Sequence, residues 1–177
     1  MTIITTTPRL ILRELTVQDA EDFFELNTNP NVLRYTGDSP FASIRQAATF
    51  LANYTHYSIH GFGRWAVIHT QTNTFLGWCR LKLHEEGFVD LGFRLFEKEW
   101  GHGYATEAAQ ASLKYGFEHV GLDEIIGRAS KQNKASINIL RKLGMTFWKH
   151  DTCDGVANAA YYKLIRESYN SKPLRSI

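Results

Sequence analysis

The chain has 177 residues, of which 44% are hydrophobic and 21% charged, and its formal net charge is +2. This length and composition indicate one globular domain over residues 1–177, with a frayed tail expected at 170–177. The small net charge argues against direct binding of nucleic acid or of an acidic membrane surface. Two cysteines are too few for a disulfide framework, and no stretch resembles a signal peptide or reaches the ~18 apolar residues of a membrane span. We therefore expect a soluble, cytoplasmic protein without a membrane partner.

The first half of the chain predicts a strand, two helices and three further strands. Residues 9–15 alternate in polarity, which is typical of a strand with one buried face. Thr16 and Asp19 have the spacing of a capping box, so a helix is expected from there to about Asn29. After a short helical turn at 31–35 and a loop, Ser43 is expected to begin a second helix. Strands are expected at 64–70, 75–84 and 88–95, joined by turns.

The segment around which the chain is organised is residues 89–117, which read VDLGFRLFEKEWGHGYATEAAQASLKYGF. It begins as an alternating strand, and from Gly103 onward small and apolar residues recur at helical spacing. The first N–H groups of a helix have no partner inside it, and with the helix dipole they form a site for an anion. Glycine at 101 and 103 would let the backbone approach that anion closely. The turn therefore predicts a pyrophosphate site, although a plain link between strand and helix remains the alternative.

The second half predicts a strand at 124–129, a helix at 134–143 ended by Gly144, and a closing antiparallel pair at 145–150 and 159–166. Three strands in a meander, followed by a crossover helix, give a mixed sheet. We therefore predict an α/β (α+β) fold with a mixed and mostly antiparallel central sheet flanked by helices.

Two common nucleotide motifs do not fit the glycine turn. A P-loop would need Gly-Lys-Ser/Thr at the end of a longer loop, and the chain has no such segment. A dinucleotide fingerprint would place a third glycine or alanine at position 106, which holds Thr106. Its acidic residue should follow the next strand, whereas Asp123 and Glu124 precede it.

The motifs of the chain resemble those of a known family. Residues 98–103, KEWGHG, resemble the Arg/Gln-x-x-Gly-x-Gly/Ala acetyl-CoA motif of the GNAT N-acetyltransferases, with Lys98 in place of the usual Arg or Gln. Residues 100–108 are similar to the RimJ/RimL branch, the ribosomal-protein N-terminal acetyltransferases and their relatives. Residues 8–13 resemble the opening strand of that branch, and 133–136 with 140–145 resemble its second CoA-contacting segment. The resemblance covers roughly residues 7–169.

This resemblance implies a GNAT-like fold and acetyl-CoA as co-substrate. It also implies an amine acceptor, either a protein N-terminus or a small amine, and no metal; a homodimer is left open. A backbone N–H between residues 93 and 95 is expected to bind the oxyanion. The residues that the resemblance assigns to acetyl-CoA are Phe93, Arg94, Leu95, Lys98, Gly101, His102, Gly103, Tyr104, Ala105, Thr106, Asn133 and Ser136.

Acetyl transfer from a thioester to an amine needs a base for the ammonium proton, a donor for the oxyanion and an acid for the leaving thiolate. Many GNAT enzymes use a tyrosine as the acid, at a position that holds Leu140 here. Ser136, by analogy with the RimJ/RimL branch, and Tyr161 or Tyr162 on the last strand are the substitutes.

Two residues are candidates for the base. Asp90, at the start of the strand 88–95, is the first, and His84, at the end of the preceding strand, is the second because imidazole titrates near neutral pH. Each also has a structural interpretation as a polar residue of a strand. Glu85 and Glu86 fit a solvated hairpin, and Glu107 fits a favourable interaction with the helix dipole.

Two functions follow. The first is an acetyl-CoA-dependent N-acetyltransferase in which the amine attacks directly within a ternary complex. The alternative is a non-catalytic acyl-CoA-binding or regulatory domain, which Leu140 keeps open. A third interpretation, a nucleic-acid-binding module, needs a basic patch that the composition does not supply. The acceptor wall is expected between residues 29 and 61, and its sequence identifies no acceptor.

Overall fold

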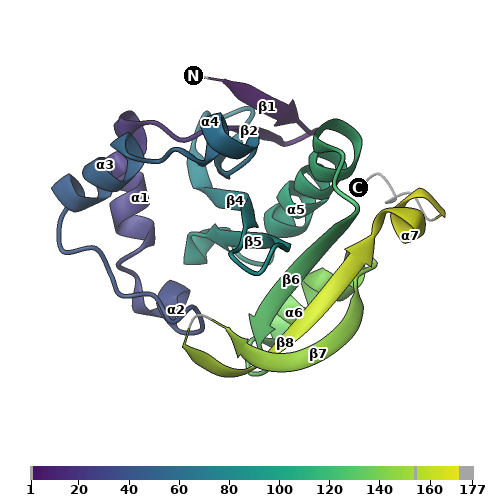
Figure 1. Ribbon diagram of the computed structural model, residues 1–177. Coiled ribbons are helices and arrows are strands. Elements are labelled where there is room, and N and C mark those ends of the chain that lie inside the picture. The colour runs from purple at the N-terminus through teal and green to yellow at the C-terminus, as the bar shows by residue number, and fades with distance from the viewer. Residues whose placement is uncertain (1, 154, 172–177) are drawn as a thin grey trace.

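The computed structural model describes residues 2–153 and 155–171. In this part of the chain eight strands form one sheet in the order β1-β2-β3-β4-β5-β6-β8-β7. All neighbouring strands are antiparallel except β5 and β6, which are parallel (Figure 1). The expected mixed and mostly antiparallel sheet is therefore confirmed. The strands are β1 (Ile3–Thr6), β2 (Leu10–Glu14), β3 (Arg64–His69), β4 (Phe75–Leu83), β5 (Val89–Leu95), β6 (Glu124–Ser130), β7 (Thr146–Cys153) and β8 (Val156–Ile165).

Helices cover both faces of the sheet. They are α1 (Ala20–Leu26), α2 (Pro30–Leu33), α3 (Ile44–Ala52), α4 (His56–His60), α5 (Tyr104–Tyr115), α6 (Lys134–Lys142) and α7 (Arg166–Ser171). Short 3-10 turns at Val17–Asp19 and Glu97–Glu99 precede α1 and α5, and α5 continues into a π-helical turn at Gly116–Val120.

Alternation along the strands places a large hydrophobic core on each face of the sheet, and a third, smaller cluster contains Ile126, Ala159 and Tyr161. In Figure 1, α1 and α3 lie on one side of β4 and β5, and α5 lies on the other. Trp78 of β4 packs into the core with Phe23 of α1 and Leu51 of α3. The next residue, Cys79, packs into the core with Leu113 of α5, as the period of two in a strand requires.

Local signals in the sequence place several element ends correctly. The Ser43 hydroxyl accepts the N–H of Gln46 at 3.2 Å and begins α3. The Asp19 carboxylate accepts the N–H of Thr16 at 2.8 Å, as a capping box does, although a 3-10 turn comes before α1. Gly144 follows α6 with φ of 78°, which is the left-handed conformation expected after a helix.

Four expectations differ from the structure. Strand β1 and helix α4 are not expected, because IITT and HYSIH are too short for a clear apolar period. Strands β7 and β8 extend into the expected loop, where Cys153 pairs with Val156. Arg166 begins α7 instead of ending a strand, and α7 includes Asn170 and Ser171 of the expected tail. The remainder of that tail, 172–177, lies outside the described residues.

Strands β5 and β6 separate near the middle of the sheet. Among the described residues they pair at two positions, Asp90 with Ile126 and Leu91 with Gly127. Strand β5 then continues to Leu95 and β6 to Ser130, so the β6-facing edge of β5 has no strand neighbour beyond Leu91. Divergence of two neighbouring strands exposes backbone N–H and C=O groups in the middle of a sheet, where a ligand can pair with them.

Candidate active site

A cavity of about 370 Å³ occupies the gap between β5 and β6. Gly92, Phe93 and Arg94 line it from β5, while Ala129 and Ser130 line it from β6. Helix α6 and the residue before it contribute Asn133, Ser136 and Leu140, and Asp90 lies deeper along β5. The structure thus brings five of the predicted site residues to one cavity: Asp90, Phe93, Arg94, Asn133 and Ser136.

The glycine turn lies directly before α5 and is open to a ligand. Gly101 and Gly103 have φ of 81° and 84°, which side chains other than glycine rarely adopt. A Cβ at Gly101 would meet nothing within 4 Å, and one at Gly103 would meet only a guanidinium nitrogen of Arg9, at 3.3 Å. Tyr104, Ala105 and Thr106 form the first turn of α5, whose N–H groups point out of the helix. This is the geometry that an anion-binding turn requires.

The turn is attached to the beginning of β2 through Glu107, which is buried. Arg9 donates from Nε to Glu107 Oε2 at 2.7 Å and from Nη1 to the His102 carbonyl at 3.0 Å. Thr7 donates to Glu107 Oε1 at 2.6 Å. Burial would raise the pKa of Glu107, but the hydrogen bonds from Thr7 and Arg9 lower it overall. Glu107 therefore fixes the position of the turn, a role for Arg9 and Thr7 that the sequence pattern did not indicate.

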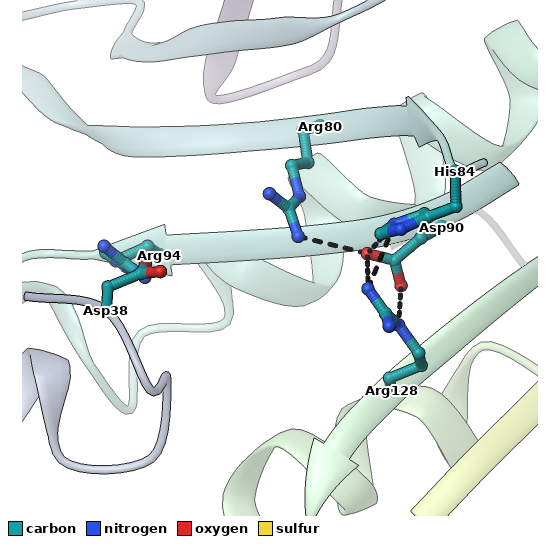
Figure 2. A network of polar contacts seen from close by, with 6 residues as sticks. All are labelled: Asp38, Arg80, His84, Asp90, Arg94 and Arg128. Atoms are coloured by element: carbon teal, nitrogen blue, oxygen red, sulfur yellow. Dashed lines mark hydrogen bonds and ion pairs between the residues drawn. The ribbon is translucent and has the colours of Figure 1, made fainter. Parts of the chain in front are cut away.

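A buried charge network surrounds Asp90 (Figure 2). Its Oδ2 lies 3.1 Å from Arg80 Nη2 and 3.5 Å from His84 Nε2, and its Oδ1 lies 3.3 Å from Arg128 Nε. Burial by itself would raise the pKa of Asp90. The hydrogen bond from His84 and the charges of Arg80 and Arg128 outweigh that effect and lower the pKa to about 2. Asp90 is thus a carboxylate throughout the physiological pH range and a weak proton acceptor.

His84 contacts both a donor and an acceptor through the same ring nitrogen. Arg128 Nη2 lies 3.0 Å from His84 Nε2, and Asp90 Oδ2 lies 3.5 Å from it. When Nε2 carries a proton it can donate to Asp90, and when it does not it can accept from Arg128. The network therefore offers a hydrogen bond to His84 in either protonation state. The ring also stacks on Phe88, with centroids 4.9 Å apart.

The other predicted residues are distributed unevenly. Asn133 caps α6 by accepting the N–H of Ser136 at 3.1 Å. Lys98 is exposed, with its ammonium 5.3 Å from the Phe96 ring centre. Tyr162 is buried and lines a separate cavity of about 310 Å³ beside Phe147. The structure does not bring Tyr162 to the cavity that Ser136 lines.

Tyr161, the other tyrosine considered as the acid, is occupied elsewhere. Its hydroxyl donates to the Thr152 carbonyl at 2.7 Å, and its ring centre lies 5.7 Å from the Arg128 guanidinium.

Arg94, at the end of β5, connects the cavity to the loop between α2 and α3. Its Nη2 lies 2.6 Å from Asp38 Oδ2 (Figure 2). Its Nη1 donates to Asn27. Its guanidinium also lies 5.0 Å from the Trp78 ring centre. Burial lowers the pKa of Arg94 somewhat, and the ion pair with Asp38 partly offsets that effect. The loop is therefore held over the cavity through a charged pair.

A second, larger cavity of about 880 Å³ adjoins the first on the α1 and α3 face of the sheet. Residues from 41 to 56 form most of its wall, within the segment where an acceptor wall was expected. Three residues line both cavities: Arg64, Arg80 and Lys82. Their shared role was missed in the sequence, because it depends on the register of β3 against β4.

The described residues contain neither a cluster suited to a metal ion nor a membrane-spanning helix. No group of three or more His, Cys, Asp and Glu side chains in this part of the chain could hold a metal ion. None of the helices within residues 2–153 and 155–171 is long and apolar enough to cross a bilayer.

Comparison with known proteins agrees with this geometry. A family model described as an acetyltransferase (GNAT) domain matches residues 9–146. An uncharacterised N-acetyltransferase, p20 of Bacillus licheniformis, is 30% identical over 77% of this chain and 79% of its own. FsC-acetyl coenzyme A-N(2)-transacetylase of Aspergillus fumigatus is 32% identical over 82% of this chain and 68% of its own.

Among solved structures, a GNAT-family acetyltransferase from Bacillus anthracis aligns with a TM-score of 0.80 at 26% identity, covering 94% of this chain and 99% of the other. The match to the family model extends over the glycine turn, the strand gap and α6. The chain therefore belongs to the GNAT family and is an N-acetyltransferase.

Proposed function

We propose that this enzyme transfers an acetyl group from acetyl-CoA to a primary amine, by direct attack of the amine in a ternary complex, and that it belongs to the RimJ/RimL branch. The observation that carries the proposal is the gap between β5 and β6. The gap joins the exposed edge of β5 to Asn133 and Ser136 in one cavity. The larger cavity lined by residues 41–56, which we call the acceptor-side cavity, adjoins it. The string at 100–108, WGHGYATEA, supports the branch.

The residues present fit acetyl-CoA. The turn at Gly101 and Gly103 has room for a pyrophosphate against the first N–H groups of α5. The edge of β5 from Gly92 onward has no strand neighbour in the described chain and offers backbone groups to an extended ligand arm. Acetyl-CoA would supply the acetyl group as a thioester. The residues proposed to hold it are Phe93, Arg94, Leu95, Lys98, Gly101, His102, Gly103, Tyr104, Ala105, Thr106, Asn133 and Ser136.

Stabilisation of the oxyanion is proposed for a backbone N–H between residues 93 and 95, on the same exposed edge. For the acid that protonates the leaving thiolate, Ser136 is favoured over Tyr162, because Ser136 lines the cavity and Tyr162 lines another one. Leu140 stands where many relatives have a tyrosine, and it is buried beneath Gly127 of β6. Of the three candidate acids, Ser136 on the first turn of α6 is the one that lines this cavity.

The base is proposed to be His84, and Asp90 is proposed to position it. Two arginines stabilise the ionised form of Asp90, so its carboxylate has little tendency to accept a proton near neutral pH. His84 Nε2 is in contact with that carboxylate and with Arg128, so it keeps a hydrogen-bonding partner after it gains a proton. Asp90 lines the cavity, and His84 Nε2 lies 3.5 Å from its carboxylate (Figure 2), so the amine proton would travel to His84 by way of a water molecule beside Asp90.

The test is release of the free CoA thiol from acetyl-CoA by the purified protein in the presence of primary amines and N-terminal peptides. Turnover with at least one amine supports the proposal. Tight acetyl-CoA binding without turnover across the panel would instead favour the non-catalytic acyl-CoA-binding domain. We further propose that the enzyme acts in the cytoplasm, where the buried thiol of Cys79 would stay reduced.

A further inference from the structure

The acceptor-side cavity has a one-sided charge. Arg45, Arg64, Arg80, Lys82 and His56 line it, and none of the described residues that line it is acidic. Burial lowers the pKa of His56, and the positive charges of its neighbours lower it further. The aromatic side chains of Phe41, Phe50 and Tyr54 complete much of the wall. The cavity is therefore positively charged and partly apolar.

Three guanidinium groups surround the Trp78 ring on this face. Arg64, Arg94 and Arg80 lie 4.3, 5.0 and 5.6 Å from its centre. Arg94 pairs with Asp38, and Arg80 pairs with Asp90, which Arg128 also contacts. Among the described residues, Arg64 has no acidic partner within ion-pair distance. The three guanidinium groups around Trp78 therefore face two carboxylates, and one of these, Asp90, is shared with Arg128.

Arg64 and Arg80 also keep unused hydrogen-bonding capacity. The Nε atoms of both are buried, and neither has a hydrogen-bond partner among the described residues. A buried donor without a partner costs free energy, and such cases in native proteins call for an explanation. Burial lowers the pKa of Arg64 to about 9, with a contribution from Arg80, so the group remains charged at neutral pH. A bound anion would supply both the charge and the acceptor atoms that are missing.

The sheet register places Arg64 and Arg80 next to the smaller cavity between β5 and β6, which we call the reaction cavity. Arg64 pairs with Arg80 across β3 and β4, and Arg80 pairs with Gly92 across β4 and β5. Gly92 has no side chain, and Arg80 lies over it, since a Cβ there would be 2.8 Å from Arg80 Nε. The row therefore runs from the charged cavity directly to the edge of β5. A small molecule held by Arg64 could place an amine near that edge.

From this arrangement we infer that the acceptor is a small amine bearing an anionic group, a carboxylate or a phosphate, which Arg64 and Arg80 bind while its apolar part packs against Phe41, Phe50 and Tyr54. The inference rests on the acetyl transfer proposed above and adds the acceptor class. Polycationic acceptors such as polyamines would be repelled by the same charges, so the cavity selects both for anions and against cations.

The test compares matched acceptors by kcat/KM in the thiol-release assay. L-Phenylalanine, its amide and 2-phenylethylamine share one ring but differ in the carboxylate. O-Phosphoethanolamine and ethanolamine differ in the phosphate, and spermidine represents the polycations. We expect each anionic amine to exceed its neutral counterpart by roughly tenfold to hundredfold, the range of a hydrogen bond to a charged group. The amine of the amide is less basic and more often unprotonated, so without an anion site the amide would react faster.

Arg64→Gln should abolish this preference, measured as the ratio of kcat/KM for L-phenylalanine to kcat/KM for 2-phenylethylamine in the same variant. Arg64→Lys keeps the charge and should retain part of the preference. Arg34→Gln removes a charge from an exposed arginine that does not line the cavity, and it should leave the preference for anionic amines unchanged. If Arg64→Gln fails to fold, inhibition of the wild-type enzyme and of Arg64→Lys by phenylacetate, an anion without an amine, gives the same information.

The outcomes separate the two levels of the proposal. Turnover that favours spermidine or the neutral amines, with acetyl-CoA binding intact, would overturn the anionic acceptor and leave acetyl transfer standing. Equal preference in wild type and Arg64→Gln would overturn the role of Arg64. No thiol release with any amine would instead count against the proposed function itself. Preference for the carboxylate alone, or for the phosphate alone, identifies which anion the cavity binds.

Discussion

The side chain of Arg80 forms an ion pair with Asp90, which lies diagonally across the strands from it and not directly opposite. In the register of β4 and β5, Arg80 faces Gly92, whereas Asp90 faces Lys82. The Arg80 side chain crosses over Gly92, and its Nη2 lies 3.1 Å from Asp90 Oδ2. This diagonal contact links the charged acceptor-side cavity to the buried network beneath the reaction cavity. A Cβ at position 92 would lie 2.8 Å from Arg80 Nε, so a larger residue there would displace the Arg80 side chain from this path.

The glycine turn gives the first prediction. Gly101→Ala should lower acetyl-CoA affinity by more than tenfold, because a side chain there enters the space that a pyrophosphate would occupy. Gly144→Ala is the matched control: both glycines have φ near 80°, and an added Cβ at either would meet nothing within 4 Å. The two variants should therefore lose similar stability, while only Gly101→Ala loses affinity in calorimetric titration. Equal affinity in both would show that the turn does not bind the co-substrate.

Ser136 gives the second prediction. If its hydroxyl protonates the leaving thiolate, Ser136→Ala should lower kcat by about 10²-fold or more and change KM for acetyl-CoA little. Tyr162→Phe, which removes a hydroxyl from another cavity, should leave both constants nearly unchanged. A rise in KM with kcat preserved would reduce Ser136 to a binding contact, and a large loss of kcat in Tyr162→Phe would return the acid role to the last strand.

The pKa of Asp90 predicts how stability depends on pH. Because this pKa falls from 3.8 to about 2 on folding, the ionised carboxylate stabilises the folded state above pH ~4. That contribution is lost as pH falls through the interval from about 4 to about 2. Asp90→Asn should remove this part of the pH dependence, and it should cost on the order of 3–5 kcal/mol at neutral pH because buried arginines lose their partner. Urea unfolding at a series of pH values measures both effects, and an unchanged acid profile would contradict the assignment.

His84 gives the fourth prediction. If His84 accepts the amine proton, His84→Gln should lower kcat/KM by roughly 10²-fold and flatten the rise of rate with pH near neutrality. The control is His119→Gln, which replaces an exposed histidine stacked on Tyr115 and should leave the profile unaltered. Asp90→Asn should lose less activity than His84→Gln, because the variant still has the imidazole. A His84→Gln enzyme with full activity and an unchanged profile would move the base role to Asp90 or to solvent.

The sequence by itself determined the parts of this protein that depend on neighbours along the chain. A period of two in β5 and a helical period in α5 define a strand and a helix, and only glycine readily adopts the backbone of the intervening turn at 101 and 103. The cap at Ser43 follows from a side chain that accepts the N–H of the residue three positions later. The mixed sheet follows from the order of these elements. These features arise within a few residues, so pattern and composition suffice to predict them.

Only the tertiary structure decided what the charged residues do. Arg80 and Asp90 are ten residues apart, and Arg128 comes from a strand beyond α5, so their contact depends on the register of three strands. The same register places Arg64 opposite Arg80 instead of opposite a carboxylate, and it exposes the edge of β5 beyond Leu91, which lines the smaller cavity. Ser136 and Tyr162 were both candidates for the acid in the sequence, and the fold places them in different cavities. Burial and strand pairing fix a side chain's neighbours, and the neighbours, not the residue type, determine whether a carboxylate accepts a proton or holds an arginine.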